Sequence, residues 1–457
     1  MADAVRRVDI DQPLPIAAPE TGLVRVLGTR QLGALIFNAT VGSGIFALPA
    51  LAVANLGAAA PLPYLLCAFL MGLVGLVYAE AGSRVGGTGG SYAYVSAGLG
   101  PFPGFLAGLI VLVSDVAAAG AVLTLLAGSL VRLLGLSGPM WEGAVAGVVI
   151  LALAAVNVAG LKAGARTVEL ATLAKLLPLV AFAVVGVFFV TPAHLRVTAL
   201  PSPRAITATA GLLLFAFTGI EQAMQPSGEV RHPERTVPRG VLLALGAVTV
   251  LYLSVQATAL GLLGPDLAKD PVAPLAAAAA VFAGGPGRRV MLAAATISTF
   301  GWLTGSLLSS PRGLYALARG GLLPRGLAAV HTRFRTPHVA IIVYAAVALL
   351  LALSGSFEKL ALLANAGSLA AYFLCALALL RLRRRGVQGA GVPFRVPGGA
   401  LVPIGTCALI AWVAMQALGR TDLEAAALTV VAGGVLYLLR PYWRRAARAG
   451  PGPAPSA

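Results

Sequence analysis

Three ionisable side chains lie inside apolar stretches of the sequence, where charge is rare. Asp115, Lys175 and Glu221 each stand in a different run of mostly Ala, Leu, Val and Gly residues. A charged residue at the centre of a membrane helix costs roughly 2.5–3.5 kcal/mol even on the most lenient scale, so such residues are usually functional. Carboxylates and amines accept and release protons and pair with ions of opposite charge. The three side chains therefore predict the binding or transfer of protons or organic ions.

The sequence lacks the paired groups that bond-breaking chemistry requires. Its three cysteines lie in separate apolar runs without a CxxC spacing, and its four histidines are scattered between such runs or at the start of one, which argues against a metal site. An intramembrane enzyme would need a second membrane aspartate or a Ser–His pair beside Asp115, and the sequence offers neither. We therefore predict that the protein is not an enzyme and needs no cofactor.

The composition indicates a protein embedded in a lipid bilayer. Of the 457 residues, 58% are hydrophobic and 11% are charged, against about 45–50% and about 25% in soluble domains. A spanning helix needs about 20 apolar residues, and twelve stretches qualify. We expect an all-α polytopic membrane protein. The predicted spans are 31–55, 60–82, 101–131, 143–161, 168–191, 207–226, 239–263, 289–317, 337–354, 359–380, 400–418 and 423–440.

The net charge of +17 is explained by membrane topology. The basic residues form short runs between apolar stretches, which does not suit a nucleic-acid-binding face. With the N-terminus in the cytoplasm, 24 of the 33 Lys and Arg residues fall on the cytoplasmic side and 8 outside, as the positive-inside rule requires. Both tails, 1–28 and 441–457, are predicted to be cytoplasmic, without a removable signal peptide, in a protein of the inner or plasma membrane.

Two spans are interrupted at equivalent positions. The first contains Gly42-Ser43-Gly44, and the sixth contains Phe217-Thr218-Gly219-Ile220-Glu221. Such breaks are tolerated in a membrane only where they are buried or line a cavity, and paired interrupted helices mark transporter binding sites. For the first glycines alone, close helix packing is an equal alternative. The breaks correspond if 29–191 and 207–380 are two five-helix repeats, with helices 11 and 12 in 400–440.

Five motifs in chain order, together covering about 30–325, carry a resemblance to the amino acid–polyamine–organocation permeases. The resemblance implies a twelve-helix transporter with inverted five-helix repeats, discontinuous helices 1 and 6, and alternating access. The motifs are Gly42-Ser43-Gly44-Ile45-Phe46, Tyr78-Ala79-Glu80 with Gly89-Gly90-Ser91-Tyr92, Phe215-Ala216-Phe217-Thr218-Gly219-Ile220-Glu221, Gly228 to Arg239, and Arg312 with Tyr315 to Gly321.

The same resemblance implies an amino acid bound between the two breaks. The substrate carboxylate is expected at Ser43, Gly44 and Ile45. The amino group is expected at Phe217, Thr218 and Gly219. The charges agree, because helix N-termini favour anions and carbonyl ends favour cations. The full set of expected substrate-binding residues is Gly42, Ser43, Gly44, Ile45, Asp115, Phe215, Phe217, Thr218, Gly219 and Glu221.

Lys175 is the main candidate for coupling to protons. Some proton-coupled members of the resembling family have a lysine in helix 5 where sodium-coupled relatives bind sodium, and Lys175 matches that position. We expect it to contact carbonyls near Gly42 and the hydroxyl of Ser298 or Thr299. Snorkelling of the long side chain to the membrane surface is the alternative.

The two carboxylates each have a structural alternative. Asp115 indicates a cationic side chain or amine as substrate, or else a salt bridge to Lys175 or a structural hydrogen bond. Glu221 is a second candidate for proton coupling, although a helix dipole alone would stabilise it. Glu80 is expected to brace a cytoplasmic helix end, with Arg84 as a possible partner.

The prediction is a secondary active transporter of amino acids or related amines, most simply coupled to protons. An exchanger or exporter is the alternative within transport, and a membrane nutrient sensor is the alternative outside it. The expected partners are the small-molecule substrate, protons and the bilayer. The sequence leaves the oligomeric state, the direction of transport and the particular substrate open.

Overall fold

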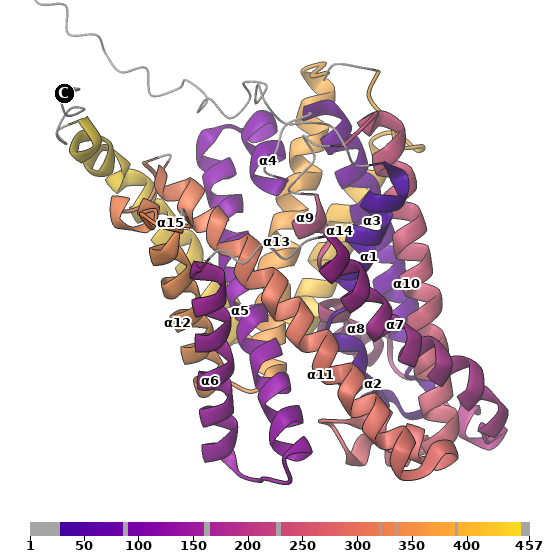
Figure 1. The fold of residues 1–457 in the computed structure, drawn as a ribbon. Coiled ribbons are helices and arrows are strands. Elements are labelled where there is room, and N and C mark those ends of the chain that lie inside the picture. Colours follow the sequence, from indigo (N-terminus) through magenta and orange to yellow (C-terminus); the bar gives the residue numbers. More distant parts are fainter. Residues whose placement is uncertain are drawn as a thin grey trace, which may run out of the picture.

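The computed structural model describes residues 28–85, 90–159, 165–224, 230–319, 321–334, 336–388 and 392–448, and within these ranges it is all-helical, without a β-strand. Most of the two predicted tails lies outside the described residues. The bundle of long helices is shown in Figure 1, with α15 at its edge. The α-helices are α1 (Thr29–Thr40), α2 (Gly44–Leu56), α3 (Leu62–Val85), α4 (Ser91–Leu99), α5 (Pro101–Leu133), α6 (Pro139–Val158), α7 (Ala165–Gly186), α8 (Pro203–Phe217), α9 (Ile220–Ala223), α10 (Pro233–Leu263), α11 (Pro274–Arg319), α12 (His338–Ser354), α13 (Phe357–Arg384), α14 (Leu401–Ala417) and α15 (Arg420–Arg448).

The predicted polytopic membrane architecture is confirmed. Within the described ranges, eight helices are long and apolar enough to span a membrane, a bent pair (α1 with α2) forms a further span, and three shorter apolar helices accompany them. Each of the twelve predicted ranges overlaps one of these helices or broken helices. Short 3-10 helices connect some of them: η1 (Gly57–Ala59), η2 (Val187–Phe189), η3 (Pro192–Leu195), η5 (Gly264–Lys269) and η6 (Arg325–Ala328).

The helices pack in two groups. In one, α10 contacts α1 and α3, while α8 contacts α2 and α3. In the other, α5 contacts α6, α11 and α12. α7 and α13 connect the groups, because α7 contacts both α10 and α11, and α13 contacts both α5 and α8. The two broken spans thus lie in the first group, and α11 of the second group contacts α2 directly.

The connection before the eighth span, residues 264–288, contains helical structure. The structure has η5 there, followed by the first turns of α11, which bends at Gly284, where φ is 57°. The short helix α4 was not predicted, because the Gly-rich segment before it reads as a loop.

Candidate functional site

The first break separates α1 from α2. α1 ends at Thr40 and α2 begins at Gly44, and their axes are bent by 51°. A Cβ atom on Gly44 would lie 2.8 Å from the Cα and Cβ atoms of Ala216, so the chain approaches α8 closely only because residue 44 is glycine. The first N–H groups of a helix have no partner within it, and those of α2 begin at this break.

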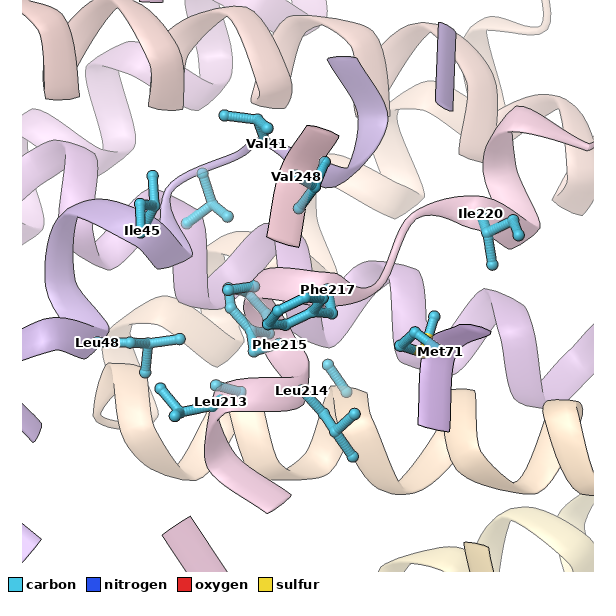
Figure 2. Packing of buried hydrophobic residues seen from close by; sticks show 14 of the residues in the cluster. Val41, Ile45, Leu48, Met71, Leu213, Leu214, Phe215, Phe217, Ile220 and Val248 are labelled. Atoms are coloured by element: carbon cyan, nitrogen blue, oxygen red, sulfur yellow. The ribbon is translucent and has the colours of Figure 1, made fainter. Parts of the chain in front are cut away.

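The second break lies beside the first. α8 ends at Phe217 and the four-residue α9 begins at Ile220. Gly219 between them has φ of 122°, and a Cβ atom there would lie 2.6 Å from the carbonyl oxygen of Ala39 in α1. Figure 2 shows the extended chain between Phe217 and Ile220, with Val41 close to the first break. The carbonyl end of α8 and the N-terminus of α2 therefore meet in one region.

Replacing Gly219 by alanine is expected to abolish transport and to lower the thermal midpoint of the purified protein. A side chain at this positive φ is strained by roughly 1–2 kcal/mol, and its Cβ would also overlap the backbone of Ala39. Uptake into proteoliposomes and thermal unfolding in detergent measure the two effects. Gly305→Ala is the control, since none of the described residues has an atom within 4 Å of a Cβ atom there. Wild-type uptake by Gly219→Ala would contradict the close packing of the two breaks.

A small, partly open cavity lies between the breaks and the helices α5, α11 and α13, within about 420 Å³ of empty space that includes open solvent. Eight of the ten residues predicted to contact the substrate line it, and its lining includes two carboxylates but no Lys, Arg or His. The lining residues are Ala39, Thr40, Gly42, Ser43, Gly44, Ser114, Asp115, Ala118, Val122, Phe215, Thr218, Gly219, Glu221, Gln222, Trp302, Ala364 and Ser368.

Among the polar groups in the cavity wall, the Ser43 hydroxyl is the one best placed to bind a ligand. It precedes the first residue of α2, its side chain is 1% exposed, and its hydroxyl has no hydrogen-bond partner among the described residues. A buried hydroxyl without a partner is costly. Beside the N-terminus of α2, which favours anions, the Ser43 hydroxyl is placed to donate to a carboxylate.

Ile45 and Phe217 do not line the cavity. The Ile45 side chain is fully buried in the core. The Phe217 ring is also fully buried and packs against Tyr64 and Tyr252, with ring centroids 6.3 and 5.1 Å apart. The aromatic residues Phe215 and Trp302 do line the cavity.

Asp115 of α5 lines the cavity and is hydrogen-bonded on both oxygens. Its Oδ1 accepts from Gln222 Nε2 at 3.0 Å, and its Oδ2 accepts from Ser310 Oγ at 3.0 Å. The carboxylate is 5% exposed, and no ion pair to it is found within the described ranges. The structural hydrogen-bond alternative is thus present, while the predicted alternative of a salt bridge to Lys175 is not.

Glu221 lies at the second break with its carboxylate held from two sides. Its Oε2 accepts from the Tyr372 hydroxyl at 2.5 Å and from the backbone N–H of Gly219 at 3.1 Å. Next to it in the cavity wall, the Ser114 and Ser368 hydroxyls lie 2.9 Å apart. Glu221 therefore joins the break to α13, a contact that the helix dipole alone does not explain.

Lys175 projects from α7 to the first break. Its side chain is 3% exposed, and its Nζ donates to the carbonyl oxygens of Asn38 at 2.8 Å and Val41 at 2.6 Å. Ser298 Oγ donates to the carbonyl of the next residue, Gly42, at 3.0 Å. The Thr299 hydroxyl bonds within its own helix instead. The ammonium group thus donates to carbonyl oxygens at the end of α1, and the side chain does not snorkel to the membrane surface.

Sequence reasoning missed Gln222, Ser310 and Tyr372. Gln222 directly follows Glu221, but its position in the sequence does not indicate that its side-chain amide reaches another helix. Ser310 and Tyr372 come from distant spans, 195 and 151 residues from the carboxylates they contact. Buried carboxylates require hydrogen-bond donors. The sequence therefore indicates that Asp115 and Glu221 need donors, but it does not indicate which residues supply them.

Glu80 holds the end of α3 to the end of α13, as the predicted brace. Its carboxylate is fully buried and accepts from Arg84 Nε at 2.9 Å, from both Nε and Nη2 of Arg383, and from the backbone N–H of Val396 at 2.9 Å. Arg84 also donates to the carbonyl of Val387 at 3.1 Å. The segment after α13 is thereby fastened to α3.

Replacing Glu80 by glutamine is expected to lower the thermal midpoint by several degrees. Breaking a buried ion pair by removing one partner costs about 3–5 kcal/mol, because the remaining charges stay buried. Glu424→Gln is the matched control: its pair with Arg420 is highly exposed, and such pairs contribute about 0–1 kcal/mol. Thermal unfolding of both variants in the same detergent measures the difference. Equal midpoints for the two would show that the brace contributes little.

These features define a class of protein: a polytopic helical transporter with two interrupted helices around a central cavity. Comparison with known proteins identifies the family. The family described as amino acid permease matches residues 27–435. The chain belongs to the amino acid permease family, and it is a multi-pass plasma-membrane transporter of amino acids rather than an enzyme.

Three relatives from Bacillus subtilis (strain 168) align over most of both chains. The methylthioribose transporter is 28% identical over 446 residues, which cover 94% of this chain and 96% of its own. The serine/threonine exchanger SteT is 29% identical over 398 residues, 84% and 89% of the two chains. The branched-chain amino acid permease BcaP is 26% identical over 465 residues, 95% and 97%.

Proposed function

We propose that this permease is a secondary active transporter that works by alternating access and is coupled to protons through Lys175. The observation that carries the proposal is the contact of Lys175 Nζ with the carbonyls of Asn38 and Val41 at the end of α1. A helix end with unpaired carbonyls attracts a cation, and the lysine ammonium occupies that place. A group that loses its charge on deprotonation suits a proton-dependent contact there.

The proposed coupling step follows from these hydrogen bonds. When Lys175 is charged, its ammonium group fastens the end of α1 to α7. When it gives up a proton, one N–H donor and the charge are lost, and the two carbonyls are held more weakly. Ser298 still holds the carbonyl of Gly42. Protonation of Lys175 thus changes how firmly α1 is fixed at the break, beside the cavity.

The cavity supports an amino acid as the substrate. The N-terminus of α2 with the unpartnered Ser43 hydroxyl suits the carboxylate, and the carbonyl end of α8 suits the amino group. Asp115 adds a negative group without a cationic partner among the described lining residues. We propose that it favours substrates with a second positive group, such as a basic side chain or a diamine.

An exchanger is the second candidate within transport. The similarity to the serine/threonine exchanger SteT favours it, while the similarity to the permease BcaP does not distinguish exchange from net uptake. The proposed orientation, with both termini in the cytoplasm, rests on the distribution of Lys and Arg.

Uptake by the purified full chain in sodium-free proteoliposomes tests the proposal. Labelled L-leucine, L-serine, L-lysine and putrescine would be supplied outside, with and without an inward proton gradient. We expect at least one of them to accumulate above the outside concentration only when the gradient is present. Uptake that ignores the gradient but needs amino acid inside would establish an exchanger. No uptake of any of the four would contradict the substrate proposal.

A further inference from the structure

The hydroxyl of Tyr252 lies between the two broken spans. Tyr252 belongs to α10, and its side chain is fully buried. Its hydroxyl oxygen lies 3.1 Å from the carbonyl oxygen of Thr40 and 2.9 Å from that of Ala216. Thr40 is the last residue of α1, and Ala216 is the penultimate residue of α8. One side chain from a third helix thus touches both breaks.

The phenol has a single O–H hydrogen, so it satisfies only one of the two carbonyls at a time. The carbonyls at the end of a helix have no partner within it, and an unpaired one inside a membrane protein is costly. The carbonyl of Thr40 also accepts from the backbone N–H of Gly42 at 2.9 Å. The Tyr252 hydroxyl can therefore donate its hydrogen bond to one carbonyl or the other as the two helix ends move, while the side chain stays in place.

The ring of Tyr252 is fixed by its neighbours. Phe217 packs against it edge to face at 5.1 Å, and Tyr64 does so at 6.5 Å, with all three side chains fully buried. Phe217 is itself the last residue of α8, next to the second break. The aromatic cluster of Tyr64, Phe217 and Tyr252 thus prevents the hydroxyl from swinging away from the two carbonyls.

We propose that Tyr252 is a positioning residue that couples the two breaks, so that the ends of α1 and α8 move together during transport. A coupling claim requires an element whose arrangement both segments bias, and the shared hydrogen is such an element. This role depends neither on the identity of the substrate nor on that of the coupling ion. Tyr252 acts through the two backbone segments and not by touching a ligand.

Tyr252→Phe tests the coupling because it keeps the ring and removes only the shared hydrogen. In proteoliposomes supplied with the same four labelled substrates, we expect the maximal rate to fall about tenfold while KM stays within about twofold of wild type. Tyr64→Phe is the matched control: it removes another buried hydroxyl of the same cluster, which donates to Gln256 Oε1 at 3.0 Å and touches neither break. Its maximal rate should stay within about twofold of wild type.

Amide hydrogen exchange of the full chain in detergent tests the coupling without any substrate. Tyr252→Phe should accelerate exchange in both segments, 37–46 and 214–224, and Tyr64→Phe should accelerate neither. Acceleration of one segment alone would overturn the coupling, as would equal effects of the two variants on exchange or on maximal rate. If no probe is transported even by the wild type, the proposed substrates fail, while the exchange data still decide the role of Tyr252.

Discussion

Replacing Lys175 by alanine is expected to abolish accumulation driven by a proton gradient, with a loss on the order of 100-fold. Alanine leaves the carbonyls of Asn38 and Val41 without the donor that they share in the wild type. A hydrogen bond to a charged group contributes about 1.5–3 kcal/mol, and two such bonds fix the end of α1. Initial rates of uptake into proteoliposomes with an imposed pH gradient measure the effect.

Lys175→Gln separates the coupling role from a structural one. Glutamine retains an N–H donor for one carbonyl but cannot change its charge. We expect this variant to exchange internal for external substrate while its uptake ignores the proton gradient. Lys359→Ala is the control, because Lys359 is exposed near the start of α13 and takes no part in the site. If Lys175→Gln still accumulates substrate with the gradient, Lys175 has only a structural role and a different residue carries the proton.

Ser298 shows how much of the site the sequence could predict. Lys175 was expected to contact carbonyls near Gly42 and the hydroxyl of Ser298 or Thr299. The hydrogen bonds described for its Nζ go to the carbonyls of Asn38 and Val41, and Ser298 Oγ donates to the carbonyl of Gly42. The sequence could not predict whether Ser298 or Thr299 makes this contact, because the rotation of α11 about its axis decides which hydroxyl faces α1. Thr299 faces carbonyls of its own helix instead.

The breaks were predictable for a different reason. A charge or a glycine cluster at membrane depth is costly unless it is buried or lines a cavity, so Gly42 to Gly44 and Phe217 to Glu221 were conspicuous in the sequence. The pairs that complete the site were not, because a contact such as Glu221 with Tyr372 depends on how two distant helices rotate against each other. The same limit applies to the side chain of Phe217, whose ring turns into the aromatic cluster while its backbone remains beside the break.

Asp115→Asn is expected to reverse the preference between a basic substrate and a neutral one of similar length. Asparagine keeps the size of the side chain and can still accept from Ser310 or Gln222, so the cavity retains its shape while losing the charge. A lost hydrogen bond to a charged group, about 1.5–3 kcal/mol, corresponds to roughly 10- to 150-fold in affinity. The ratio of kcat/KM for L-lysine over L-methionine should fall by that factor.

Ser310→Ala is the control for this comparison, because it removes one donor to Asp115 and leaves the carboxylate in place. A carboxylate with one donor fewer attracts a cation at least as strongly, so the preference for L-lysine should persist or grow. If Asp115→Asn slows L-lysine and L-methionine equally while the thermal midpoint falls, Asp115 serves to tie α5 to α9 and α11. The cavity would then have one substrate-facing carboxylate, Glu221, and the proposed substrate class would narrow to neutral amino acids.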